Sequence, residues 1–370
     1  MPGTASSALM ELQLLKGPLD DARLAAIADL YGAYNRKYRD VAFCRRLFNE
    51  NPHGYSLHAL LVHESGRTVG HYGAIPIDIL VDGERRLSGK GEAFVVHEGH
   101  RGATLSLPGE EPMACGLAMP LHLYRFARNQ GMELVHMIAD PAVGLIHRMT
   151  GCRALPIRHV KARLAVRPLP APSPDRAAWR TVARTALAAG QSLLSGIAAG
   201  ALAGGPAARV WRGADLTPAA LARIAADACP GAGWTVAVDA PLLAWLGSTG
   251  DLDVIALDEA MDDYAVVCGR VGDAPAREIV LWRQRSGGIP AAVRLLAAVV
   301  RHARHLGDAT VACSHGAAWD AAELARLRAA GRHLFFHESE RSANLYVHTA
   351  DRYYLDAQNL RFTPIFYSVF

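Results

Sequence analysis

Cysteine pairs, basic tracts and a secretory leader are all missing from this 370-residue sequence. The six cysteines are scattered without a CxxC pair or a dense framework, so we expect a reduced cytoplasmic protein. His302 and His305 have helical spacing for a metal pair, but no carboxylate or cysteine accompanies them, so no metal is expected. The formal net charge is only +4, which suits an acidic ligand but predicts no nucleic-acid partner. The N-terminus lacks a basic start followed by a long apolar core, so no signal peptide is predicted.

Common signatures of nucleophiles and nucleotide sites are also missing. The sequence contains no GxSxG, no GxxxxGK[ST] and no GxGxxG, so it shows no marker of a serine hydrolase, a P-loop or a dinucleotide-binding domain. What is present is 51% hydrophobic and 20% charged residues, a composition typical of a packed globular protein. The length fits two domains of ordinary size.

Two regions of the chain share one order of predicted elements. Residues 1–165 contain a strand, two helices, three strands separated by turn signals, a helix, a strand, a helix and a strand. Residues 209–370 contain two helices, three strands, a helix, a strand, a helix and a last strand. This order predicts two tandem copies of one mixed α/β fold.

A linker with unusual composition separates the two regions. Residues 166–174 read VRPLPAPSP, a proline-rich boundary, and no charged residue occurs between Arg184 and Arg209. The uncharged stretch is mostly Ala, Gly and Ser, so residues 185–208 predict a buried or interfacial helix rather than a membrane-spanning one. Peripheral contact with the inner membrane through this helix stays an open alternative. The expected domains are therefore 1–165 and 209–370, joined by 166–208.

The stretch GEAFVVHEGHRGATLSLPG, from Gly91 to Gly109, joins a predicted strand to the helix that begins near Cys115. Backbone N–H groups of a glycine-containing turn before a helix can converge on an anion, and the helix dipole adds to the attraction. About ten residues lie between the His-Arg-Gly turn and the helix, and they include the acidic pair Glu110 and Glu111. A phosphate cradle at this turn would be either enlarged or partly dismantled.

This element order and two local patterns resemble the GCN5-related N-acetyltransferase superfamily. That family has V-x-P-x-x-R-G-x-G after a central strand, where this chain has Val96 to Ala103 with Glu98 in the proline place. It also has Asn, then Tyr, then Gly-Phe after the next strand, where this chain has Asp140, His147 and Gly151-Cys152. The resemblance implies twisted, mostly antiparallel sheets flanked by helices, with a splayed strand beside the turn.

The resemblance also implies an acyl-CoA donor, of acetyl or longer chain, with an acyl carrier protein as an alternative carrier. The cofactor-binding residues that it implies are Val95, Val96, His97, His100, Arg101, Gly102, Ala103 and Asp140. His147, in the place of the family's tyrosine, would be the general acid that protonates the departing thiolate. A surface histidine on a short helix is the other interpretation of His147.

Acyl transfer to an amine needs a general base, and Glu92 is our first candidate. It lies four residues before Val96, so strict strand alternation would place both side chains on the same face of the sheet. His136 on the next strand is the second candidate. A solvated edge position is the alternative interpretation of Glu92.

The second copy lacks the His-Arg-Gly pattern and keeps only Arg285, Gly287 and Gly288 before its helix. With one intact and one degenerate half, the chain resembles tandem proteins that occur among bacterial N-acyltransferases of amino sugars. In those proteins the degenerate half helps to form the acceptor site. We expect four residues to bind the acceptor: Tyr72, Tyr353, Tyr354 and Asp356. Three hypotheses stay open, namely transfer to a nucleotide-linked amino sugar, transfer to a long-chain lipid amine such as a sphingoid base, and a non-catalytic scaffold.

Overall fold

The computed structural model describes residues 10–32, 34, 40–139, 141–165, 190, 193, 196–197, 200, 207–228, 232–248, 252–270, 275–315, 321–334 and 337–361. Asp140, the proline-rich linker and most of the helix expected over 185–208 lie outside these residues. Among the helices that are described, none is long and apolar enough to cross a membrane.

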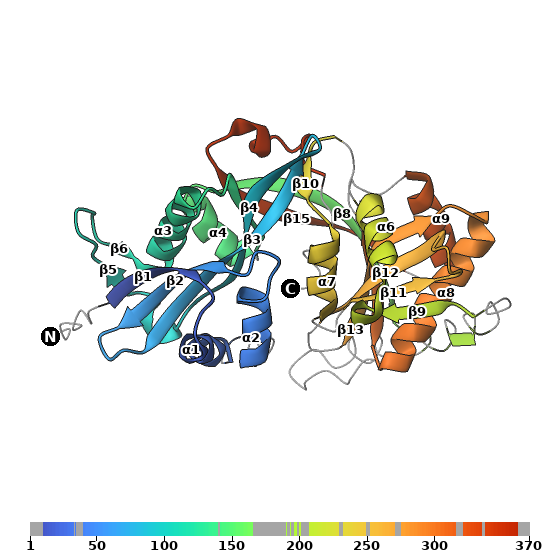
Figure 1. Cartoon of the computed structure of the whole chain (residues 1–370), viewed down its shortest axis with the longest axis horizontal. Helices are drawn as coiled ribbons and strands as arrows, with labels where there is room; N and C mark the ends of the chain where they lie inside the picture. The colour runs from blue at the N-terminus through green and yellow to red at the C-terminus, as the bar shows by residue number, and fades with distance from the viewer. Residues whose placement is uncertain are drawn as a thin grey trace. The chain divides into compact units, whose positions relative to one another are not determined.

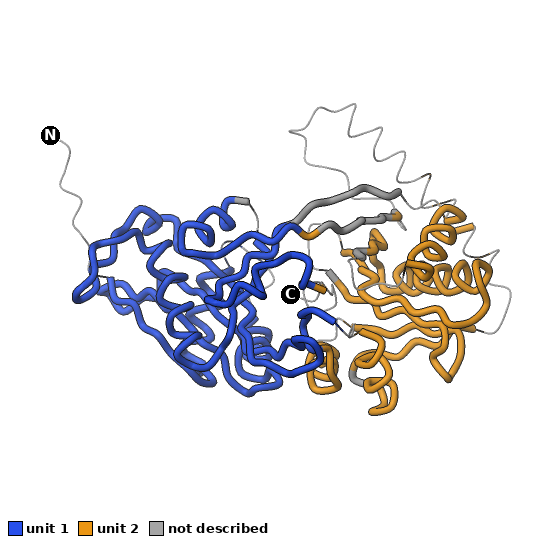
Figure 2. Tube along the Cα trace, turned by 90° about the horizontal axis from the view of Figure 1, so that it is seen from above, with its two compact units in different colours: residues 1–156, 231–237, 343–360 blue, residues 157–230, 238–342, 361–370 orange. Residues whose placement is uncertain are grey.

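The chain forms two compact units (Figure 2). Unit 1 comprises residues 1–156, 231–237 and 343–360, and unit 2 comprises residues 157–230, 238–342 and 361–370. Each unit therefore combines segments that are far apart in the sequence.

Unit 1 is built on one sheet with the strand order β1-β2-β3-β4-β7-β15, and β10 pairs with β3. Its neighbouring strands run antiparallel except β4 and β7, which are parallel. The elements are β1 (Met10–Gly17), α1 (Asp21–Gly32), α2 (Val41–Phe48), β2 (Ser56–His63), β3 (Thr68–Val81), β4 (Glu84–Val96), β5 (Thr104–Leu105), β6 (Met113–Ala114), α3 (Cys115–Asn129), β7 (Leu134–Ile138), α4 (Pro141–Met149), β10 (Trp234–Val236) and β15 (His337–Thr349). Strand β8 (Arg153–Ala165) begins in unit 1 and continues into unit 2 from residue 157.

Local sequence accounts for the first helices and hairpins of unit 1. Asp40 caps α2 by accepting a hydrogen bond of 2.8 Å from the Ala42 N–H, as an N-cap aspartate does. Asp82 and Gly83 both have positive φ, 49° and 90°, which is the backbone that a two-residue hairpin between β3 and β4 requires. These turns confirm the predicted antiparallel meander.

Helices cover both faces of the unit 1 sheet, with α3 and α4 on one face and α1 and α2 on the other (Figure 1). Met119, Leu123 and Tyr124 of α3 pack against Leu61 of β2 and Met137 of β7 in one buried cluster. The other face buries Leu24 and Ile27 of α1 and Phe48 of α2. The central strands β3 and β4 are therefore enclosed on both sides.

Unit 2 has the sheet order β8-β14-β13-β12-β11-β9, with only β13 and β14 parallel. Its core lies around the long helix α8, whose buried residues contact the strands on one face. The elements are β9 (Arg209–Arg212), α6 (Pro218–Ala228), α7 (Ala240–Ser248), β11 (Leu252–Ala256), β12 (Asp263–Arg270), β13 (Ala276–Gln284), α8 (Gly288–Leu306), β14 (Thr310–His315) and α9 (Ala321–His333).

The last strand of each copy pairs within the opposite unit. Residues 160–165 of β8 form an antiparallel ladder with β14, and residues 345–349 of β15 form one with β7. The units thus do not follow the boundaries expected at 165 and 209, because the hydrogen bonds of each terminal strand are made with the other copy. The repeated order of elements is present, but its final strands are exchanged.

Three histidines of unit 1 are buried without any exposed surface: His58, His71 and His136. His58 Nδ1 lies 3.0 Å from His71 Nε2, between the rings of Phe48 and Tyr31. Burial lowers the pKa of His71 and of His136 to about 3, and it lowers the pKa of His58 well below its usual range. All three are neutral in the folded protein at neutral pH.

These histidines predict acid sensitivity of unit 1. Their folded pKa values lie below the unfolded value of about 6.5, so below pH 6.5 the unfolded chain takes up protons that the folded chain does not. Lowering the pH from 7.5 to 5.5 is expected to cost about 1.4 kcal/mol per buried histidine, or about 4 kcal/mol for the three. Urea denaturation at both pH values measures this loss.

His136→Phe is expected to remove about one third of that pH dependence. The matched control is His305→Gln, at an exposed position on α8, which is expected to leave it unchanged. Equal pH dependence in the His136 variant and the wild type would contradict a neutral buried histidine at this position.

Candidate functional site

An extra residue interrupts the central strand of unit 1. His71 of β3 pairs with Val95 of β4, whereas Gly73 pairs with Glu92, so one residue of β3 faces two residues of β4. Ala93, at this point, has a φ of 60°, which is unusual for a residue with a side chain. The geometry is that of a β-bulge, which bends a strand and re-aims its side chains.

The bulge places Glu92 and Val96 on opposite faces, so the alternation argument from the sequence is wrong. Val96 belongs to the cluster under α3. Glu92 pairs with Gly73, where an added β-carbon would approach Phe48 of α2 to 3.0 Å. One extra residue reverses the alternation between the two positions, and Glu92 therefore faces α1 and α2.

Strands β4 and β7 separate next to the bulge. Their parallel ladder consists of two pairs only, Gly89 with Val135 and Lys90 with His136. Beyond Lys90, the edge of β4 has no strand partner on the β7 side within the described residues. This is the splayed strand that the family resemblance implies.

The turn after β4 uses most of its own N–H groups. Those of His100, Arg101 and Ala103 donate to carbonyl groups inside the turn, the Glu98 N–H donates to the Tyr34 hydroxyl at 2.9 Å, and the Gly99 N–H donates to a ring nitrogen of His97. The Arg101 side chain folds back, donating from Nε to the Val96 carbonyl at 3.2 Å and stacking over the Tyr34 ring. The turn as a whole therefore does not form a cradle for an anion.

The histidines of the turn cluster among themselves. The His100 ring lies 5.3 Å from that of His63 and 5.7 Å from that of His97. Burial, followed by the neighbouring His63 and His97, lowers the pKa of His100. His100 is therefore a neutral hydrogen-bonding group at neutral pH rather than a cation.

The inserted residues form a short hairpin, β5–β6, that returns the chain to the turn. The Cys115 N–H at the start of α3 donates to the Ala103 carbonyl at 3.0 Å, so turn and helix are joined as if the insertion were absent. Glu110 is paired with His122 at 3.1 Å and with Arg125 at 2.9 Å. Its carboxylate is thereby held along α3.

The first turn of α3 has N–H groups to offer to an anion. Its N-cap residue, Ala114, makes no side-chain capping bond, and no acidic residue lies in the first turn. Helix geometry leaves the N–H groups of Gly116 and Leu117 without an intrahelical acceptor. A β-carbon at Gly102 or at Gly116 would meet nothing within 4 Å. The candidate anion site therefore lies where Gly102 meets the start of α3.

Glu92 is held by an ion pair with Lys90, two residues earlier on the same face of β4. Both side chains are mostly buried, with 5% of Lys90 and 10% of Glu92 exposed. His136 lies beside Lys90, with Nε2 3.3 Å from the Ser88 hydroxyl, and its lowered pKa makes it a weak base. The sequence interpretation missed Lys90, although its spacing from Glu92 places the two on one face.

His147 lies on the α3 face, 1% exposed, and its Nδ1 is 2.6 Å from the Tyr124 hydroxyl. The Tyr124 hydroxyl is in turn 3.3 Å from that of Tyr72. His147 is thus neither a surface histidine nor a group that stands alone. Tyr124 was missed because no local pattern distinguishes it from an ordinary core tyrosine of α3.

The expected acceptor residues near the C-terminus lie at the other end of β4. The Tyr353 hydroxyl donates to Asp82 at 2.8 Å, and the Tyr354 hydroxyl donates to Glu133. Asp356 accepts a hydrogen bond from the Gln358 N–H at 2.9 Å within its own turn. Asp82 is in the β3–β4 hairpin, about 30 Å along the strand from Glu92. The structure brings Tyr72, but not these three residues, to the bulge.

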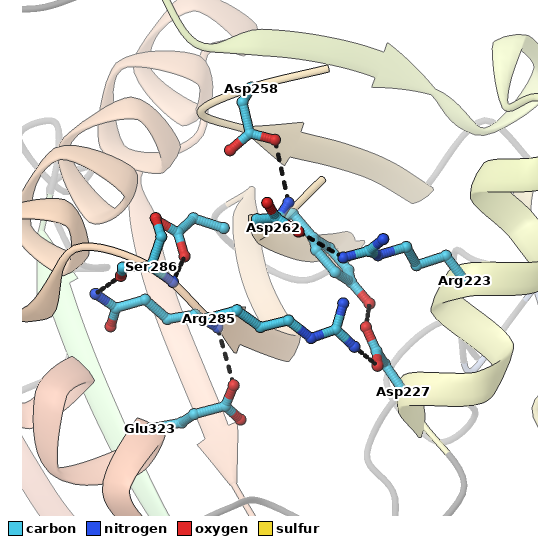
Figure 3. A network of polar contacts seen from close by, with 10 residues as sticks. Arg223, Asp227, Asp258, Asp262, Arg285, Ser286 and Glu323 are labelled. Atoms are coloured by element: carbon cyan, nitrogen blue, oxygen red, sulfur yellow. Dashed lines mark hydrogen bonds and ion pairs between the residues drawn. The ribbon is translucent and has the colours of Figure 1, made fainter. Parts of the chain in front are cut away.

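In unit 2, acidic side chains surround the turn that corresponds to the one after β4 (Figure 3). Asp227 pairs with Arg285 and accepts a hydrogen bond of 2.7 Å from Tyr264. Glu323 pairs with Arg283 at 2.6 Å. The arginines that could attract an anion are therefore already neutralised by carboxylates of unit 2.

The described residues contain no group of three or more His, Cys, Asp or Glu side chains that could hold a metal ion. At the level of sequence, no family model and no curated protein matches this chain.

Solved structures do match over nearly the whole chain. A protein of Enterococcus faecalis V583, described as a probable N-acyltransferase, is 11% identical with a TM-score of 0.54, over 92% of this chain and 73% of its own. A GCN5-related N-acetyltransferase of Kribbella flavida is 14% identical with a TM-score of 0.52, over 93% and 72%. A tandem protein of this type from the clavulanic acid biosynthesis pathway is 14% identical with a TM-score of 0.52, over 92% and 99%.

These similarities establish the fold. The chain has the tandem fold of the GCN5-related N-acetyltransferases, as the sequence resemblance implied, with mostly antiparallel sheets flanked by helices. At identities of 11–14%, the match concerns the arrangement of the chain alone.

Asp227 is expected to stabilise unit 2. Asp227→Ala leaves the buried Tyr264 hydroxyl without its acceptor and removes the partner of Arg285, at an expected cost of about 2–3 kcal/mol in the free energy of unfolding. Denaturant unfolding measures the loss. The control is Glu259→Ala, which breaks the exposed pair with Arg209 and is expected to cost about 0.5 kcal/mol or less. Equal small losses in both variants would contradict a buried network.

Proposed function

We propose that the protein is an acyl-CoA-dependent N-acyltransferase and that unit 1 carries the reaction. The observation that supports this most strongly is the opened β4–β7 ladder beside the bulge, in a fold shared with acetyltransferases. Beyond Lys90, β4 pairs with no β7 residue among those described, and this edge is suited to hydrogen-bond amide groups of the donor's pantetheine arm. The N–H groups of Gly102, Gly116 and Leu117 are suited to bind its diphosphate.

Glu92 is the proposed general base. Its side chain is mostly buried, it is fixed by Lys90, and it lies next to the bulge where β4 leaves β7. A base removes a proton from the amine as the nitrogen attacks the thioester carbonyl, and an N–H of the β4 edge can stabilise the oxyanion that forms.

The proposed acceptor is an amino sugar, preferably linked to a nucleotide. This choice rests on the family resemblance, and a long-chain lipid amine is the alternative that the uncharged stretch 185–208 favours. The two acceptors can be distinguished by the assay conditions under which turnover is seen. Turnover of acetyl-CoA with a UDP-linked amino sugar in detergent-free buffer supports the first, whereas turnover only with a sphingoid base in mixed micelles supports the second.

Gly116→Glu tests the anion site without weakening the helix. An acidic residue in the first turn of a helix is favourable for the dipole, and the position has room for a side chain, so stability is expected to be kept. The negative charge is expected to repel the diphosphate and to weaken CoA binding about tenfold or more, measured by titration calorimetry. Gly116→Ala is the control and is expected to bind CoA as the wild type does.

Glu92→Gln tests the base. The amide keeps a hydrogen-bond acceptor for Lys90 but cannot take a proton, so kcat is expected to fall by about 10²–10⁴ with CoA affinity unchanged. The control is Glu84→Gln, at the exposed start of the same strand. Unchanged turnover in Glu92→Gln would remove this residue from the mechanism.

A non-catalytic binding protein with the same fold is the second candidate. It is favoured by the turn after β4, whose N–H groups are mostly used internally, and by the retracted Arg101. Saturating CoA raises the melting temperature of a protein that binds it, by mass action. No shift with CoA or acetyl-CoA would favour the non-catalytic candidate over the enzyme.

A further inference from the structure

Three histidine rings gather at the end of β4, and we call them the histidine cluster. His63 is the last residue of β2, whereas His97 and His100 belong to the turn after β4. The ring of His100 lies 5.3 Å from that of His63 and 5.7 Å from that of His97. All three residues are partly exposed, so a ligand can reach them. None of them takes part in the acyl transfer proposed above.

Backbone N–H groups determine where two of these rings carry their hydrogen. Nδ1 of His63 accepts a hydrogen bond of 3.1 Å from the Ser65 N–H, and Nδ1 of His97 accepts one of 3.3 Å from the Gly99 N–H. A neutral imidazole that accepts at one nitrogen carries its hydrogen on the other, so Nε2 is a donor in both rings. Among the described residues, neither Nε2–H has an acceptor.

The side chains that act on His100 are all basic. Burial lowers the pKa of His100 most, and His63, His97 and Arg67 lower it further. The same groups would stabilise a negative charge placed among them, because each can offer an N–H or a positive charge. The corresponding turn of unit 2 differs in this respect, since carboxylates pair with its arginines.

The histidine cluster adjoins the candidate site for the donor's diphosphate. His100 is two residues before Gly102, and its carbonyl group accepts a hydrogen bond of 3.0 Å from the Ala103 N–H. A β-carbon at Gly102 would meet nothing within 4 Å. In CoA, one ribose carries both the diphosphate and a 3′-phosphate. The two anionic groups of the ligand are therefore neighbours, as are the two parts of this turn.

We infer that the histidine cluster binds the 3′-phosphate of CoA, with the Nε2–H groups of His63 and His97 donating to the phosphate oxygens. His100, whose ring is next to both, completes the site. The inference rests on the proposed function and specifies its donor. The phosphopantetheine of an acyl carrier protein has no 3′-phosphate, so the cluster selects free acyl-CoA over a carrier-bound acyl group.

Calorimetric titration of the full chain with CoA and with 3′-dephospho-CoA tests this assignment. The wild type is expected to bind CoA about tenfold more tightly than dephospho-CoA, because hydrogen bonds to a charged group are strong. In His100→Gln and in His97→Asn, this preference is expected to fall to about threefold or less, while the affinity for dephospho-CoA is kept. His97→Asn retains an acceptor for the Gly99 N–H, so the turn is expected to keep its fold.

The matched control is His305→Gln, at an exposed position on α8 of unit 2, which is expected to keep the full preference for CoA. If neither ligand binds the wild type, the proposed function and this inference are both wrong. Equal affinities of the wild type for the two ligands overturn the inference alone. A preference that persists in both variants also overturns it, because another group would then bind the 3′-phosphate. Should one variant fail to fold, the other carries the test.

Discussion

One extra residue in β4, at the bulge of Ala93, determines which face of the unit 1 sheet carries each of the side chains around it. A strand that paired regularly with β3 would keep Glu92 and Val96 on one face of the sheet. The bulge at Ala93 turns the following residues over and coincides with the loss of parallel pairing. Among the described residues, β4 therefore has no ladder with β7 beyond Lys90, and the Glu92 carboxylate and the Tyr72 phenol lie on opposite sides of the sheet.

Unit 2 contains the same backbone device. Val266 and Val267 of β12 pair with Leu281 and Ile279 of β13, so Val280 is the extra residue, and the ladder with β14 ends at Ile279. The difference between the units therefore lies in the turn that follows. Acidic side chains surround the turn of unit 2, whereas the turn of unit 1 is held by its own carbonyl groups and by Tyr34. The helix that follows the turn begins without a side-chain cap and without an acid in both units. The sheet is duplicated, and the charge pattern is not.

Element order, hairpins and helix starts could be predicted from the sequence because local patterns determine them: Asp40 at a cap and Asp82-Gly83 at a turn are visible in one dimension. The face of Glu92 could not, because a bulge is decided by the partner strand and leaves no local signal. Tyr124 was missed for a related reason, since its role depends on His147, 23 residues away. The pairing of Glu110 with α3 was likewise invisible, because it depends on how the β5–β6 hairpin folds back.

The exchange of terminal strands makes the folding of each copy depend on the other. The segment 343–360 completes the sheet of unit 1, although it follows residues 238–342 of unit 2 in the sequence. Loss of the second half from the gene would leave β7 with an exposed hydrogen-bonding edge, a known route to aggregation. A copy whose turn is filled with carboxylates can therefore be retained by selection for the sake of its partner's folding, independently of any ligand that it binds.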